Sequence, residues 1–196
     1  MNRREWLRSM SALAVGAIAG PSLLAVFDAH ATSRKPDAKP QFLDPARYSL
    51  VGAVSDIVIP RTDTPGAVDV GVPLFIDQMF VAVYTKADRT RYLTAMAAFE
   101  KAAGKPFLQL DDAQRKALVT RLHTEALAVP RGGKLAPAAD FVLMSKKLAM
   151  LGFFLSQPGC TQVLQYAPVP GAWKGDIPLA EAGNGRAWAV ETELKI

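Results

Sequence analysis

Few side chains in this sequence have the chemistry of a catalytic or metal-binding site. The 196 residues include two histidines, His30 and His123, and one cysteine, Cys160. No Cys-x-x-Cys pair, Cys-x-x-Cys-His sequence or histidine-rich run is present, which argues against zinc, iron–sulfur and covalently attached haem. The serine-nucleophile and phosphate-binding motifs are absent, and Gly183-Asn184-Gly185-Arg186 lacks the third glycine of a dinucleotide site. We therefore expect this chain to hold no catalytic residue, cofactor or metal.

His123 and two carboxylate pairs are the remaining candidates for acid–base chemistry. His123 has a glutamate two residues further along a predicted helix, where the two side chains point apart. A solvated or half-buried structural histidine therefore competes with a general base. Asp111 and Asp112 start the same helix, where capping and the helix dipole explain them. Asp63 and Asp69 flank a Pro-Gly turn, which favours aspartate for its local backbone bonds, so neither pair indicates catalysis.

The first 31 residues have the pattern of a twin-arginine signal peptide. The motif residues are Arg3, Arg4, Trp6 and Leu7. An apolar segment follows and ends at Ala29-His30-Ala31, a small-x-small cleavage site. Glycine and proline interrupt that segment, which is not typical of a membrane span. We expect residues 1–31 to direct export to the periplasm of a bacterium, with an amphipathic helix or an uncleaved anchor as the alternatives.

The 165 residues that remain after the signal have the size of one domain with a hydrophobic core. The formal net charge falls from +5 to +4, because the signal carries three arginines against two acidic residues. No run of five to eight Lys and Arg residues and no interleaved aromatic platform is present. Nucleic acid is therefore not an expected partner.

Apolar residues at helical spacing predict a single compact all-α domain of about five main helices, over residues 42–165. The polar, proline-containing segment 32–41 predicts a flexible linker before it. Asp44 is the expected N-cap of the first helix and Asp111 that of the fourth. The helices are expected at about 45–59, 72–84, 88–103, 112–129 and 138–156. The expected buried face of the second is Phe75, Ile76, Met79, Phe80 and Val83.

Residues 166–196 are rich in glycine and proline and contain Trp173 and Trp188. The composition alone is compatible with disorder. Tryptophan, however, supplies a large contact area and is enriched at binding hot spots. We expect an extended C-terminal arm that docks on a partner through these two side chains.

Cys160 has no cysteine partner within the chain and follows a proline and a glycine, which predicts a surface turn. Free cysteine is among the most buried residue types, so an inert buried thiol is one interpretation. The oxidising surroundings of an exported protein favour the other, a disulfide with a second chain. With such a disulfide, the helix that ends at Ser156 would lie against the partner.

Four segments resemble the signature of the gluconate 2-dehydrogenase subunit 3 family. They are residues 55–67 (SDIVIPRTDTPGA), Gly71-Val72-Pro73, Phe75-Ile76-Asp77 and residues 170–178 (PGAWKGDIP). The similarity extends over nearly the whole chain after the signal. It is specific for the family and says little about the substrate.

This resemblance implies a noncatalytic small subunit that binds a large FAD-containing subunit of the glucose–methanol–choline oxidoreductase type. Such complexes oxidise sugars, sugar acids or polyols, often with a multihaem cytochrome c, which holds haem c and passes electrons to quinone. The family's small subunit carries the export signal, helps the large subunit mature and takes it, already folded, through the twin-arginine translocase. The resemblance thus implies a periplasmic complex at the outer face of the inner membrane. An independent periplasmic enzyme using His123 or the carboxylates around Asp63, and a stand-alone binding or scaffolding module, are the alternatives.

Overall fold

Five α-helices form the part of the chain that the computed structural model describes, residues 39–130, 132–164 and 178. They are α2 (Pro45–Val58), α3 (Val72–Ala82), α4 (Lys86–Ala103), α5 (Asp112–Ala128) and α6 (Pro137–Leu155), with a 3₁₀ turn η1 (Phe107–Gln109) and a π-helical turn η2 (Gly159–Val163). These residues contain no strand, and the predicted all-α fold is confirmed. The predicted signal, most of the 32–41 linker, and the arm with Trp173 and Trp188 lie outside the described residues, apart from Pro178.

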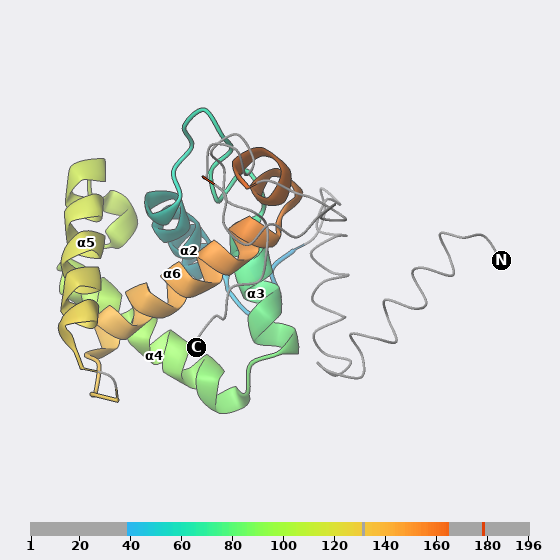
Figure 1. The fold of residues 1–196 in the computed structure, drawn as a ribbon. Helices are drawn as coiled ribbons and strands as arrows, with labels where there is room; N and C mark the ends of the chain where they lie inside the picture. Colours follow the sequence, from blue (N-terminus) through green and yellow to red (C-terminus); the bar gives the residue numbers. More distant parts are fainter. Residues whose placement is uncertain (1–38, 131, 165–177, 179–196) are drawn as a thin grey trace.

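The long helix α6 lies at the centre of the domain. Figure 1 shows it crossing the middle of the fold, and it packs against α2, α3, α4 and α5 as well as the turn η2. Its sequence is apolar on most of its circumference, as expected of a helix that is covered on several sides. The buried apolar side chains of α6 are Ala139, Phe141, Val142, Leu148, Ala149 and Phe153.

Aromatic rings connect the helices around α6. Phe80 of α3 lies 4.3 Å from Tyr92 of α4, and Tyr92 lies 5.3 Å from Phe141 of α6, measured between ring centroids. The Tyr92 hydroxyl is 2.9 Å from the Ser145 hydroxyl on α6, which satisfies both groups inside the core. Burial raises the pKa of Tyr92 well above its usual value. Tyr92 is therefore a neutral core residue at physiological pH.

One glycine lets α3 and α6 approach each other closely. A Cβ atom at Gly152 would lie 2.5 Å from a ring carbon of Phe75, a distance that real side chains do not tolerate. The same addition at Gly52 in α2 would meet its nearest neighbour, Pro73, at an ordinary 3.7 Å. Gly152 is thus required by the packing of Phe75, whereas Gly52 is not.

A buried carboxylate attaches the incoming chain to the helical core. Asp77 in α3 is fully buried and accepts backbone N–H bonds from Gln41, Phe42 and Leu43 at 2.7, 2.9 and 2.7 Å. The Phe42 ring stacks on Phe80 at 5.0 Å between centroids. The segment that precedes α2 is therefore fixed in place by both polar and aromatic contacts.

The helix boundaries follow the capping chemistry of the sequence. Asp44 caps α2, and Asp111 forms the predicted capping box of α5 with Gln114. A second capping box, formed by Thr85 and Asp88, starts α4 two residues before the predicted position. Because α3 ends at Ala82, Val83 is its C-cap and 36% exposed, so the prediction that Val83 is buried was wrong.

Replacing Asp77 by alanine should lower the free energy of unfolding by about 3 kcal/mol, because one buried and two part-buried N–H groups lose a charged acceptor. Urea denaturation followed by circular dichroism measures the change. Asp63→Ala is the control, since Asp63 is exposed and, among the described residues, accepts a hydrogen bond from the neighbouring Thr62 hydroxyl alone, at 2.9 Å. A loss of equal size in both variants would contradict the role given to Asp77.

Candidate functional site

The loop between α2 and α3 is held together by Asp69. Both carboxylate oxygens of Asp69 accept from the Arg61 guanidinium, with the Nε bond at 2.7 Å, and the Gly66 backbone N–H donates to Oδ2 at 2.8 Å. The bonds from Arg61 and then from Gly66 lower the pKa of Asp69. A Cβ at Gly66 would lie 2.8 Å from the backbone nitrogen of Arg61, so the turn requires glycine there. Asp69 therefore organises the loop rather than offering a free carboxylate for acid–base chemistry.

The other predicted carboxylates are also in local structural contacts. Asp63 accepts a hydrogen bond from the Thr62 hydroxyl at the surface. Within the described part of the chain it makes no hydrogen bond or ion pair with a histidine. Asp111 accepts the Gln114 backbone N–H at 2.8 Å as the cap of α5. Asp112 is exposed and forms an ion pair with the half-buried Arg115 at 3.6 Å. These contacts agree with the structural interpretation of both pairs.

His123 is half-buried on α5 and faces Lys146 of α6. The Lys146 Nζ lies 2.8 Å from His123 Nε2, so the ammonium group donates to the imidazole lone pair. Burial, followed by the positive charge of Lys146, lowers the pKa of His123. The imidazole is neutral near pH 7 and its Nε2 is already used as an acceptor. This geometry favours the structural role over that of a general base.

Cys160 lies in the π-helical turn η2, half-buried rather than at the tip of a surface turn. Its thiol donates to the Phe154 carbonyl oxygen at 2.9 Å. The turn packs close to α6 because Gly159 has no side chain, since a Cβ there would lie 2.0 Å from the Phe153 carbonyl oxygen. Burial raises the pKa of the Cys160 thiol. A thiol of this kind is not activated as a nucleophile.

Two buried acids, Asp77 and Asp140, were not predicted. Asp140 on α6 is 7% exposed and binds Arg91 of α4 through two bonds, at 2.8 and 2.7 Å. Burying an acid without a partner is costly, so an aspartate within an apolar helical segment indicates a specific partner. The sequence around Asp77 has this pattern. Its partners are backbone groups, which the sequence does not identify. Among the described residues, no group of three or more His, Cys, Asp and Glu side chains could hold a metal ion.

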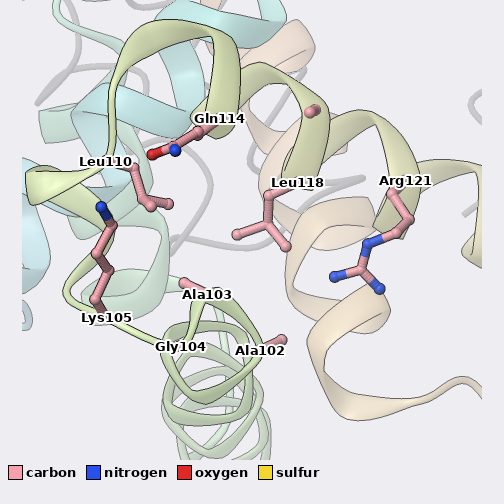
Figure 2. Close-up of a pocket in the computed structure, with 9 residues that line it drawn as sticks. Ala102, Ala103, Gly104, Lys105, Leu110, Gln114, Leu118 and Arg121 are labelled. Carbon is pink, nitrogen blue, oxygen red and sulfur yellow. The ribbon is translucent and has the colours of Figure 1, made fainter.

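A groove lies between the end of α4 and the face of α5, and we call it the α4–α5 groove. It is lined by Ala102, Ala103 and Lys105 at the end of α4 and by Ala117, Leu118 and Arg121 on α5 (Figure 2). Its volume is about 610 Å³, and it is open to solvent. The groove exists because α4 and α5 each pack on α6 rather than on each other. Small alanine side chains on its walls keep it open.

Neither the α4–α5 groove nor its lining residues were predicted from the sequence. The only signal was the alanine-rich end of α4, and alanine is equally common in ordinary helices.

Within the described segments, no helix has both the length and the apolar character needed to cross a bilayer.

The chain matches a protein-family model. The family model described as Gluconate 2-dehydrogenase subunit 3 matches residues 45–171, about two thirds of the chain. The matched region includes the Arg61–Asp69 pair, Asp77, the α4–α5 groove and Cys160. No curated protein and no solved structure matches the chain.

The His123–Lys146 contact predicts a pH dependence of stability. Since the pKa of His123 is lower in the folded chain than the ordinary 6.5, the unfolded chain binds a proton below this pH that the folded chain does not. The contribution of the neutral imidazole is therefore complete above pH 6.5 and is lost as the pH falls below it. Replacing His123 by glutamine should make the free energy of unfolding less dependent on pH between 8 and 5.

Urea denaturation at several pH values measures this dependence. Thr124→Gln, at an exposed position of the same helix, should keep the profile of the unmodified protein. Parallel profiles for the unmodified protein and His123→Gln would show that His123 titrates alike in both states.

Proposed function

The chain belongs to the gluconate 2-dehydrogenase subunit 3 family, which comprises small subunits of dehydrogenase complexes, and on this basis we propose that it is the noncatalytic small subunit of a FAD-dependent dehydrogenase. The family match over residues 45–171 carries the proposal. The described side chains that could do acid–base or nucleophilic chemistry support it. Asp69, His123 and Cys160 each make structural contacts that occupy the atoms a reaction would need.

The substrate and the cofactors then belong to partner chains. The large subunit would hold FAD and oxidise a CH–OH group of a sugar, sugar acid or polyol, and a third subunit, a multihaem cytochrome c, would accept the electrons through haem c. This chain would bind the large subunit and assist its maturation. Its rigid helical core, centred on α6, suits such a role because the core offers a fixed surface for assembly.

Export is the second part of the proposed role. Residues 1–31, with Arg3, Arg4, Trp6 and Leu7 as the motif and Ala29-His30-Ala31 as the cleavage site, would engage the twin-arginine translocase for the whole complex. The complex would then work in the periplasm, at the outer face of the inner membrane. The contacts of Asp77 support this arrangement, because the linker enters the domain at a fixed point close to Gln41.

The Cys160 thiol and the C-terminal arm are the proposed attachment points. A disulfide between Cys160 and a cysteine of the large subunit would form when a periplasmic disulfide oxidant accepts the two electrons and two protons that the two thiols release. The Cys160 thiol must first leave the Phe154 carbonyl, which costs one weak hydrogen bond. The arm, residues 166–196, would add Trp173 and Trp188 as anchors on the partner surface. Together they would place the α6 and η2 end of the domain against the large subunit.

Replacing Arg3 and Arg4 by lysine should retain dehydrogenase activity in the cytoplasm, because the large subunit would depend on this signal. Activity and large-subunit antigen in periplasmic and cytoplasmic fractions measure the effect, and we expect a loss of more than tenfold from the periplasm. Arg8→Lys, which leaves the pair intact, is the matched control. Normal export of the activity in the double variant would contradict a shared signal, and flavin bound to the isolated chain would contradict a noncatalytic subunit.

Non-reducing gel electrophoresis of the purified complex tests the disulfide. We expect one heavy band that separates into two chains after reduction, and two chains without reduction in Cys160→Ser. Two chains without reduction in the unmodified complex would leave Cys160 as a half-buried free thiol.

A further inference from the structure

The α4–α5 groove has a surface chemistry that the helical core does not require. Leu110 and Leu118 lie at its base and are each 8% exposed, while Ala102, Ala103 and Ala117 form walls of minimal size. A core-facing position would favour larger side chains that fill the space between the helices. The alanines instead leave an apolar surface open to another molecule.

Two cations stand on opposite sides of this apolar surface. Figure 2 shows Lys105 beyond the end of α4 and Arg121 on α5, with Leu118 between them. Lys105 makes no ion pair or hydrogen bond with any described residue, whereas Arg121 pairs with Glu125 at 3.0 Å, with both side chains exposed. An exposed ion pair of this type contributes little to the stability of the fold, so the Arg121 guanidinium can also bind a carboxylate of another molecule.

The groove lies in a basic segment of the chain, residues 101–147. Residues 101–147 contain nine Lys and Arg residues against four Asp and Glu residues, whereas residues 39–77 contain three against five. Of the four acids in this segment, one caps a helix and three form ion pairs. They are Asp111, Asp112, Glu125 and Asp140. The segment therefore keeps an excess of five positive charges, and of the two groove cations Lys105 is the one without an acidic partner among the described residues.

We propose that the α4–α5 groove binds an acidic segment of the large subunit, with apolar side chains against Leu118 and the alanines and carboxylates at Lys105 and Arg121. This inference rests on the proposed function. The concave shape favours a protein segment over a lipid headgroup layer, because a flat bilayer surface does not reach an apolar floor between two helices. Closing the groove would also exclude water from the ion pairs, which strengthens them.

The test measures the dissociation constant of the complex of this chain with its flavoprotein, at increasing NaCl concentration. Lys105→Glu with Arg121→Glu should weaken binding at least about tenfold and reduce the salt dependence. Ala117→Trp fills the groove without a change of charge at an exposed helical position and should weaken binding by a similar factor. The matched charge control is Lys86→Glu with Arg47→Glu, which makes the same change of charge at two exposed positions outside the groove. The matched size control is Ala87→Trp at the exposed start of α4, and both controls should stay within about twofold.

Circular dichroism of each variant first confirms that its fold is retained. Unchanged affinity in both groove variants, with a complex formed by the unmodified chain, would overturn the inference and leave the proposed function intact. Equal losses in the groove variants and the controls would overturn it too. The inference would also be wrong if the groove variants lost binding to phosphatidylglycerol vesicles but kept their affinity for the flavoprotein, because the groove would then bind lipid. If the unmodified chain forms no complex, the proposed function itself fails.

Discussion

The fold depends on the need to bury α6 on several sides at once. An apolar helix of this length exposes too much hydrophobic surface unless other helices cover it, and α2, α3, α4 and α5 each do so. This constraint also explains why α4 and α5 do not pack on each other. They share α6 as their support, and the α4–α5 groove is the space that remains between them.

Local sequence signals predicted most of the helical framework. Asp44 and Asp111 marked helix starts, and Phe75, Ile76, Met79 and Phe80 marked a buried face, because capping and periodicity act within a few residues. Features that depend on distant contacts were not predicted. The partners of Asp77 lie about 35 positions away, and the half-buried thiol of Cys160 depends on a carbonyl at the end of α6. Val83 was assigned to the wrong side because α3 ends one residue before it.

Three acidic side chains of the described domain stabilise its fold. Asp69, Asp77 and Asp140 hold a loop, an incoming segment and a helix pair, and each has a partner at hydrogen-bond distance. His123 has its acceptor nitrogen occupied by Lys146. Two cations lie beside the α4–α5 groove: Lys105, which has no partner among the described residues, and Arg121, which forms an exposed pair with Glu125.

The attachment of residues 41–43 to Asp77 has a mechanical consequence. A pulling force applied to the N-terminal segment would enter the domain through the three N–H bonds to one carboxylate, and these bonds would share the load. Because α3 packs on α6, the load would pass directly to the most covered helix of the domain. The domain would then resist being unfolded from its N-terminal end.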